Sequence, residues 1–167
     1  MPAELLLGLA PVCGPHTRLL VLGSFPSVAS LQAQAYYAHP RNAFWPLVGA
    51  LLGAPLAEWP YERRLDAVRA RGLGIWDVYA RCRRAGSLDA DITEAVPNDL
   101  PGLVATLPEL RLIAHNGGES ARAMRVTRTL GVPVLQLPST SPAHASWSFE
   151  RKRAAWAQAF GQAGLLG

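Results

Sequence analysis

The sequence predicts a single α/β domain in which a parallel sheet is covered by helices on both faces. Short apolar runs alternate with amphipathic segments along the whole chain, and no linker, repeat or low-complexity segment interrupts the alternation. This pattern is typical of parallel sheets, because each crossover helix packs back onto a face of the sheet. A length of 167 residues suits one core, so we expect one domain over residues 1–167.

Four segments have the features of strands. "RLLVLG" at 18–23 is a short apolar run that ends in glycine, as expected for a strand buried on both faces. "GLGIWDVYARC" at 72–82 predicts a second strand that runs into a loop. "LRLIAHNGG" at 110–118 and "VPVLQLPSTSP" at 132–142 each predict a strand that ends in a polar turn.

Six segments have the apolar spacing or the capping residues of helices: 27–35, 42–52, 58–71, 98–107, 119–131 and 148–164. Ser27, Asn98 and Ser148 are the expected N-caps, since their side chains can accept a hydrogen bond from the first helical turn. Glycines 72 and 131 are expected to end the third and fifth of these helices.

Unusual polar clusters follow all four predicted strands: "GSFPS", "WDVYARC", "HNGGES" and "LPSTSPAH". In parallel sheets, ligand sites form at the carboxyl ends of the strands. We therefore expect the four clusters to meet in one crevice.

Composition excludes several classes of protein. With 50% hydrophobic and 17% charged residues, the chain is neither disordered nor a coiled coil. Its apolar runs are too short for membrane spans, and "ELLLGLAPV" lacks the basic region of a signal peptide, so we expect a cytoplasmic protein without membrane contact. Two cysteines and four histidines without metal-ligand spacing predict no metal and no cofactor. The net charge of +4 modestly favours anionic partners.

The first polar cluster permits a serine hydrolase. Ser24 follows a strand on a sharp turn, and His144 or His39 could act as its base. However, Ser141 stands where such enzymes place the aspartate that precedes the histidine by three residues. This esterase remains an alternative hypothesis, and a DNA-binding module without chemistry is another.

The later clusters suit a nucleic acid. Hydroxyls in a proline-flanked loop, Ser139 to Ser141, are good phosphate contacts, although an ordinary surface turn would also explain them. Asn116 can read a base edge or bond its own backbone as a turn residue.

"YYAHPRNAFW" at 36–45 combines rings for stacking, a cation for phosphate, and Asn42, which can hold a water or contact a base. We assign Phe44 and Trp45 to the core of the following helix.

Taken together, these motifs resemble the uracil-DNA glycosylase superfamily and, within it, the hypoxanthine-DNA glycosylase branch called family six. The pattern "LGSFPS…YYAHPRNAFW…GIWDVYARCRRAGSLD…HNGG…LPSTSPAH" extends from about Leu19 to Trp156. The resemblance implies a four-stranded parallel sheet between helices, in a monomeric enzyme without cofactor. It also implies that the enzyme flips a deaminated base, chiefly hypoxanthine, out of DNA and hydrolyses its N-glycosidic bond.

The resemblance assigns roles to individual residues. Asn42 matches the asparagine taken as the main catalytic group of the branch, whereas Phe25 replaces the water-positioning asparagine of mismatch-specific relatives. Tyr37 matches an aromatic residue that stacks on the flipped base. The expected base-binding residues are Gly23, Ser24, Phe25, Tyr37 and Asn116. The expected DNA-binding residues are Arg41, Ser139, Thr140, Ser141 and His144, with residues 142–146 as a wedge.

Overall fold

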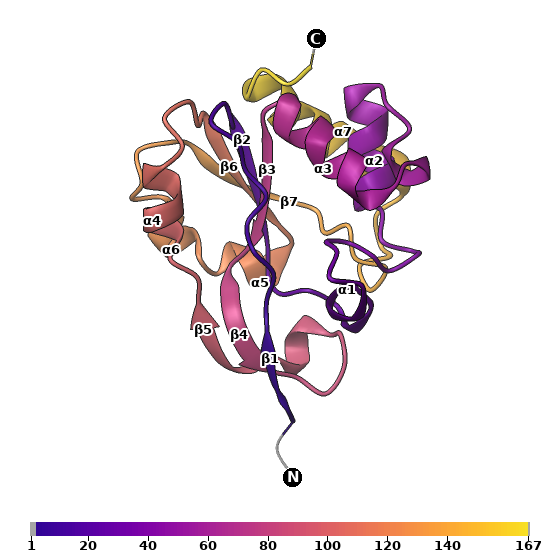
Figure 1. Cartoon of the computed structure of the whole chain (residues 1–167), viewed down its shortest axis with the longest axis vertical. Coiled ribbons are helices and arrows are strands. Elements are labelled where there is room, and N and C mark those ends of the chain that lie inside the picture. Colours follow the sequence, from indigo (N-terminus) through magenta and orange to yellow (C-terminus); the bar gives the residue numbers. More distant parts are fainter. Residues whose placement is uncertain (1–2, 167) are drawn as a thin grey trace.

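A four-stranded parallel sheet forms the centre of the computed structural model, which describes residues 3–166 (Figure 1). The predicted domain ends, residues 1–2 and 167, lie outside the described residues. The strand order is β3-β2-β6-β7, with bounds β2 Leu19–Gly23, β3 Leu73–Asp77, β6 Leu112–Asn116 and β7 Val134–Leu137. The parallel sheet predicted from the alternating pattern is confirmed.

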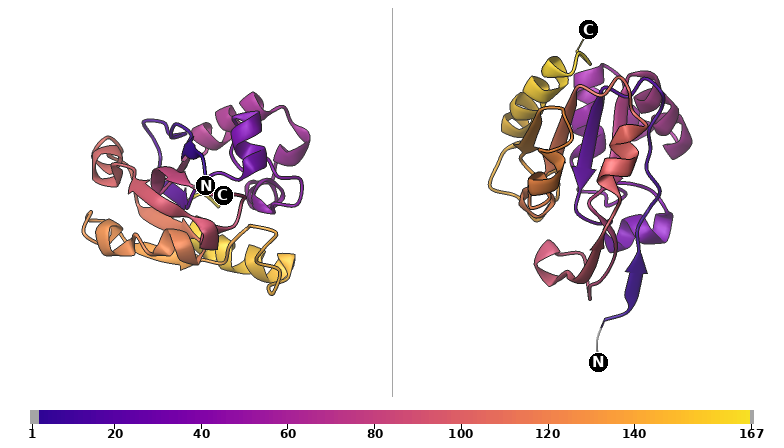
Figure 2. Two further views of the ribbon diagram at one scale, coloured as in Figure 1. Left: turned by 90° about the horizontal axis from the view of Figure 1, so that it is seen from below. Right: turned by 90° about the vertical axis from the view of Figure 1, so that its left-hand side faces the viewer.

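Side chains of β2 alternate between two apolar cores, as the period of a strand requires. Leu19 and Val21 pack with α2 (Phe44–Leu52), α3 (Tyr61–Ala70) and α7 (Phe149–Gln162). Leu20 and Leu22 pack on the other face, with α4 (Leu100–Ala105) and the segment of α5 (Gly118–Ala121) and α6 (Met124–Thr127). Figure 2 shows the sheet between its helices, as predicted.

The register of the sheet brings the carboxyl ends of the strands to one edge. Gly23 pairs with Asp77 across β2 and β3, and Asn116 pairs with Leu137 across β6 and β7. The short helix α1 (Val28–Ala33) follows β2 on this side of the molecule (Figure 1). The polar clusters are therefore held close together by the backbone pairing itself.

A second, antiparallel sheet was missed by the sequence analysis. It consists of β1 (Leu5–Leu7), β4 (Tyr79–Arg83) and β5 (Thr93–Pro97), in the order β1-β4-β5. The prediction of a loop after the second strand is thus wrong, because residues 79–83 pair on both sides. All residues of β5 are exposed, so its sequence lacks apolar alternation.

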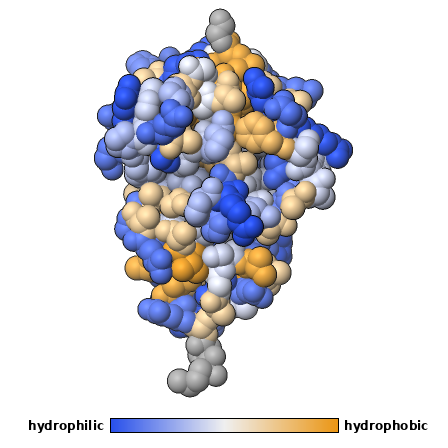
Figure 3. Space-filling model, turned by 90° about the vertical axis from the view of Figure 1, so that its right-hand side faces the viewer, coloured by the Kyte–Doolittle hydropathy of each residue, from blue (hydrophilic) through white to orange (hydrophobic). Residues whose placement is uncertain are grey.

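On the face shown in Figure 3, apolar residues form separate spots among hydrophilic ones.

Helix ends agree with the predicted caps in two cases and differ in others. Ser27 accepts a hydrogen bond from the Ser30 amide, and Ser148 accepts one from the Arg151 amide. Asn98 is not the cap of α4, because Asp99 accepts from the Gly102 amide in that role.

Other boundaries also shift. The predicted helix 58–71 begins only at Tyr61, after a 3-10 turn over Leu56–Glu58. The predicted helix 119–131 is divided into the two short helices α5 and α6. A further 3-10 turn, η2, spans Asp89–Asp91. None of the helices in residues 3–166 is long and apolar enough to cross a membrane.

A buried histidine joins β6 to the helical segment beneath it. The Ser120 hydroxyl donates to the Leu22 carbonyl (2.6 Å) and therefore accepts from His115 Nδ1 (2.9 Å). The Thr127 hydroxyl lies 2.9 Å from His115 Nε2 and donates a hydrogen bond to it. Burial is the main cause that lowers the pKa of His115 to about 4. The imidazole is consequently neutral in the folded protein at neutral pH.

We predict that this histidine destabilises the fold in acid. In the unfolded chain it takes up a proton near pH 6.5, but in the folded protein only near pH 4. The contribution of His115 to the free energy of unfolding is therefore complete above pH 6.5, and it decreases by up to about 3 kcal/mol as the pH falls toward 4. Urea unfolding at pH 7.0, 5.5 and 4.5 should show that the difference in the free energy of unfolding between wild type and His115→Gln becomes smaller at each step. A difference that does not change with pH would contradict this prediction.

Candidate active site

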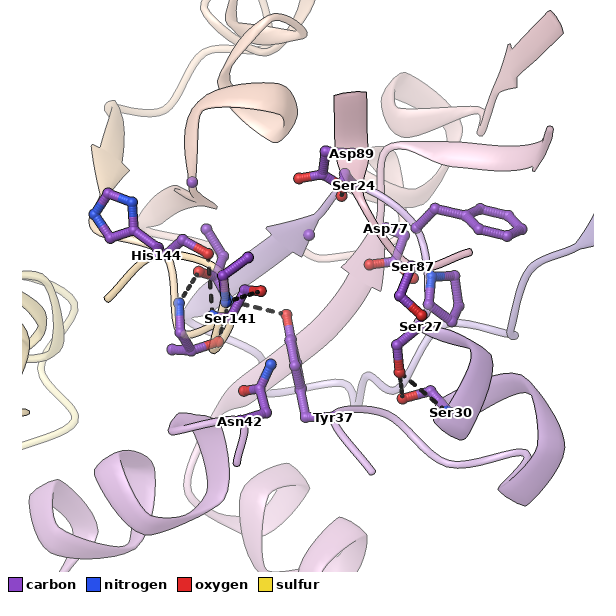
Figure 4. Close-up of a pocket in the computed structure, with 18 of the residues that line it drawn as sticks. Ser24, Ser27, Ser30, Tyr37, Asn42, Asp77, Ser87, Asp89, Ser141 and His144 are labelled. Atoms are coloured by element: carbon purple, nitrogen blue, oxygen red, sulfur yellow. Dashed lines mark hydrogen bonds between the residues drawn. The ribbon is translucent and has the colours of Figure 1, made fainter. Parts of the chain in front are cut away.

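A pocket of about 370 Å³ opens at the carboxyl edge of the parallel sheet (Figure 4). This volume lies in the usual range of small-molecule sites. The pocket is lined by Gly23–Pro26 after β2, Asp77 at the end of β3, Asn116–Gly118 after β6, and Ser139–Ser141 after β7. The other lining residues are Ser27, Ser30, Tyr36, Tyr37, Asn42, residues 87–90, Ala143 and His144. The four polar strand ends therefore do meet in one crevice.

The segment 36–45 divides between core and pocket. Phe44 and Trp45 are buried in the core at the start of α2, as predicted. The Tyr36 hydroxyl donates to the Ala10 carbonyl (2.7 Å), and its own carbonyl accepts from Trp45 Nε1 (2.9 Å). Tyr36 thus anchors the segment at the pocket wall, and Tyr37 and Asn42 line the pocket beside it.

Tyr37 presents a flat ring to the pocket. Its backbone has a φ of 55°, a left-handed conformation that is uncommon for a bulky residue. One ring face stacks on Phe44, with centroids 3.9 Å apart and planes inclined by 16°. A flipped base could stack only on the opposite face. Burial, assisted by the nearby Asp77, raises the pKa of Tyr37 above its ordinary value, so the hydroxyl stays protonated.

Asn42 is oriented by the start of α2. Its Oδ1 accepts a hydrogen bond from the Phe44 amide at 2.9 Å. The adjacent Ala43 amide donates to the Thr140 carbonyl (2.9 Å), which attaches this turn to the loop after β7. This is the bond that the Asn42 side chain makes in the described residues, so its Nδ2 is a free donor for a ligand. Figure 4 shows Asn42 beside Tyr37.

Asn116 lies in the pocket wall with its amide already bonded. Its Oδ1 accepts from the Thr140 amide (3.0 Å), and its Nδ2 donates to Thr140 Oγ1 (3.0 Å) and to the Tyr37 hydroxyl (3.3 Å). These bonds connect β6 to the loop after β7 and to Tyr37. The base-reading role expected for Asn116 stays a prediction. The contacts that Asn116 makes hold Tyr37 and the loop after β7 in position.

The loop after β7 contains the residues expected to contact DNA phosphates. Ser139 and Ser141 are half-buried and line the pocket, whereas Thr140 is 1% exposed. The predicted phosphate contact therefore does not extend to the Thr140 side chain, which holds Asn116 instead. His144 also lines the pocket, and its carbonyl accepts from Lys152 Nζ (2.9 Å), which ties the loop to α7.

The other predicted residues are placed as follows. The Ser24 hydroxyl donates to Asp89 Oδ1 at 2.6 Å, and Figure 4 shows His144 well separated from Ser24. No serine–histidine pair of the kind an esterase requires therefore exists at Ser24 within residues 3–166. Phe25 is buried, with its ring centroid 5.3 Å from the Arg84 guanidinium carbon. Arg41 is exposed and does not line the pocket.

Asp77 is a pocket residue that the sequence analysis missed. It is 4% exposed, and its Oδ2 has no hydrogen-bond partner in the described chain. Burial is the main cause that raises the pKa of Asp77 to about 7, with a smaller contribution from the charge of Asp89. The available signal was an aspartate at the end of an otherwise apolar strand, "LGIWD".

Arg84 was missed as well. This buried arginine donates from Nη2 to the Pro26 carbonyl (2.6 Å) and from Nε to the Gly86 carbonyl. It therefore holds the turn after β2 against the loop that carries Asp89. Its positive charge opposes the rise in the pKa of Asp77. Within residues 3–166, no cluster of three or more His, Cys, Asp and Glu side chains is arranged to hold a metal ion.

The chain is similar to proteins of known family. Residues 10–160 match the family model of the uracil DNA glycosylase superfamily. A hypoxanthine DNA glycosylase of Methanosarcina acetivorans is 37% identical over 87% of this chain and 92% of its own length. One of Methanosarcina barkeri is 34% identical over 92% of this chain and 96% of its own length.

A solved structure has the same fold. It is a solution NMR structure of a Methanosarcina acetivorans protein provisionally described as a uracil DNA glycosylase. It superimposes with a TM-score of 0.87 at 34% identity, covering 96% of this chain and 99% of that one. The family model spans the four strands of the parallel sheet, the pocket and the loops that line it, and the chain accordingly belongs to the uracil DNA glycosylase superfamily.

Proposed function

We propose that this protein is a monofunctional DNA glycosylase that flips hypoxanthine out of DNA and hydrolyses its N-glycosidic bond, leaving an abasic site. The observation that carries the proposal is the likeness to two hypoxanthine DNA glycosylases over more than nine-tenths of their length. A pocket with a stacking ring and a free amide donor, at the carboxyl ends of the strands, supports it.

In the proposed reaction, the flipped base stacks on the open face of Tyr37. The bond between C1′ and the base breaks, the electron pair leaves with the base, and a water adds to the oxocarbenium-like sugar. The added water loses one proton to solvent, and the departing base anion takes up one proton from solvent. Asn42 Nδ2 donates to that water or to an acceptor on the departing base. Because a carboxamide is too weak a base to take a proton at neutral pH, Asn42 contributes positioning and charge stabilisation rather than proton abstraction.

The remaining contacts are proposed to hold the DNA backbone. The Ser139 and Ser141 hydroxyls and His144 face the flanking phosphates, residues 142–146 enter the base stack, and Arg41 contacts a phosphate outside the pocket. A net charge of +4 supports binding to a polyanion. We further propose that the protein works as a monomer without metal or membrane, in the cytoplasm where its DNA substrate lies.

The substrate is tested with duplexes that contain one hypoxanthine, uracil, xanthine or normal base. Incubation followed by alkaline cleavage of abasic sites should give strand scission on the hypoxanthine duplex above a no-enzyme control. Absence of scission on every duplex would overturn the proposal. Binding to the hypoxanthine duplex without scission would favour a lesion-binding module, and Ser24-dependent hydrolysis of a p-nitrophenyl ester would favour an esterase.

The role of Asn42 is tested by Asn42→Ala. Loss of the Nδ2 donor should lower the single-turnover rate at least about tenfold, which corresponds to about 1.4 kcal/mol. Gln32→Ala, which removes an exposed amide from α1, serves as the control and should keep the wild-type rate. A normal rate in Asn42→Ala would remove this residue from catalysis.

The backbone contact of Arg41 is tested by salt dependence. Arg41→Ala should weaken binding to all duplexes alike and make the slope of log K against log salt less steep by about 1. Arg111→Ala makes the same charge change just before the amino end of β6, at the opposite edge of the sheet. Equal slopes for the two variants in binding titrations at 50–200 mM salt would argue against an Arg41 contact.

A further inference from the structure

A carboxyl group without a partner lines the pocket. Asp77 is 4% exposed, its Oδ2 makes no hydrogen bond in the described chain, and no cation lies within ion-pair distance of it there. Burying an uncompensated charged carboxylate is costly. Such a group in a cleft is a candidate for direct contact with a ligand.

The fold makes room for this carboxyl group. Gly23 pairs with Asp77 across β2 and β3, and a Cβ at position 23 would lie 2.5 Å from Asp77 Oδ1 and 3.2 Å from the Tyr37 hydroxyl. Any larger residue at position 23 would displace the carboxyl group. Asn98 Nδ2 also donates to the Asp77 carbonyl (2.8 Å), which fixes the backbone where β3 ends. The position of Asp77 is therefore specified by two other segments, β2 through Gly23 and the segment that carries Asn98.

Several charged or titratable groups surround Asp77. Asp89 in η2 disfavours a second negative charge, and Arg84 after β4 favours one. The hydroxyls of Tyr36 and Tyr37 remain neutral, since burial raises the pKa of both. His144 lines the same pocket from the loop after β7. Among these effects the removal of water dominates, and the pKa of Asp77 rises to about 7.

We propose that Asp77 is a catalytic residue that contacts the flipped base with its side-chain carboxyl group and, in its neutral form, donates a hydrogen bond to the departing base. The inference rests on the proposed function, because it concerns the same pocket. Negative charge develops on the base as its bond to C1′ breaks. A neutral carboxyl group stabilises that charge, whereas a carboxylate at the same place opposes it.

Hypoxanthine suits a neutral carboxyl group. Such a group offers one O–H donor and one carbonyl acceptor. The base carries acceptors at O6 and N7 and a donor at N1, so one carboxyl group can meet both kinds. Bound DNA brings phosphates and excludes water, and both effects favour the neutral form further. The hydrogen stays on Asp77 in this contact, so no additional reactant is required.

The proposal predicts a distinctive pH dependence. The single-turnover rate on a hypoxanthine duplex should fall as the pH rises through a midpoint at or above about 7, by up to about tenfold between pH 6 and pH 8. Asp77→Asn, whose amide donates at every pH, should change less than about twofold over this range and stay active. Asp77→Ala should be slower than Asp77→Asn at pH 6 by at least about tenfold.

Two further variants separate Asp77 from its neighbours. Asp89→Asn removes a negative charge and should shift the midpoint to lower pH, while His144→Gln should keep the wild-type midpoint. Asp66→Asn, whose wild-type side chain is 83% exposed on α3, is the matched control and should leave the profile unchanged. If the pH dependence persists in Asp77→Asn, or disappears in His144→Gln, the proposal is wrong.

A measurement without substrate distinguishes the two proposals. The side-chain carboxyl carbon of Asp77, followed by NMR in the free protein, should titrate near pH 7. Titration below pH 5 would overturn the role of Asp77 whatever the enzyme cleaves. Failure to release any base from the duplexes would instead overturn the proposed function, and with it a catalytic role for Asp77.

Discussion

The complete burial of β2 between β3 and β6 is the constraint on which the pocket depends. Each residue of this strand is buried from solvent, and its leucines and valine pack into two apolar cores on opposite faces of the sheet. A shift of one residue would exchange those faces, so the register is strongly specified. The turn after Gly23 is consequently fixed at the sheet edge, beside the ends of β3 and β6.

The pocket combines polar groups that are satisfied with groups that are not. Asn116, Thr140 and Tyr37 bond to one another and hold the wall in place. Asp77 Oδ2 and His144 Nε2, in contrast, are buried without a partner in the described chain, and Asn42 is bonded there only through Oδ1, which leaves its Nδ2 free. Buried polar groups are normally paired, so unpaired ones in a pocket are the groups available to a ligand. This distinction separates residues that build the site from residues that act in it.

The neutral state expected for Asp77 also suits the electrostatics of DNA binding. A carboxylate deep in the pocket would repel an approaching phosphate backbone, particularly with Asp89 nearby. Keeping the carboxyl group protonated removes that repulsion and provides a donor. The same desolvation that makes the group costly to ionise thus gives it a chemical use, and Gly23 and Asn98 maintain its position.

The sequence by itself determined the parallel sheet, most of its helices and the convergence of four polar loops, because apolar periodicity and caps are local signals. It also indicated that Phe44 and Trp45 belong to the core. Only the tertiary structure decided which amide is free: the Asn116 amide bonds the distant Thr140 through both its oxygen and its nitrogen, whereas Asn42 accepts only from the neighbouring Phe44 amide. Likewise, an aspartate at the end of an apolar strand was visible in the sequence, but only the fold buried Asp77 beside Gly23 without a partner. Strand β5 formed only through pairing with β4, since its exposed residues carry no apolar alternation.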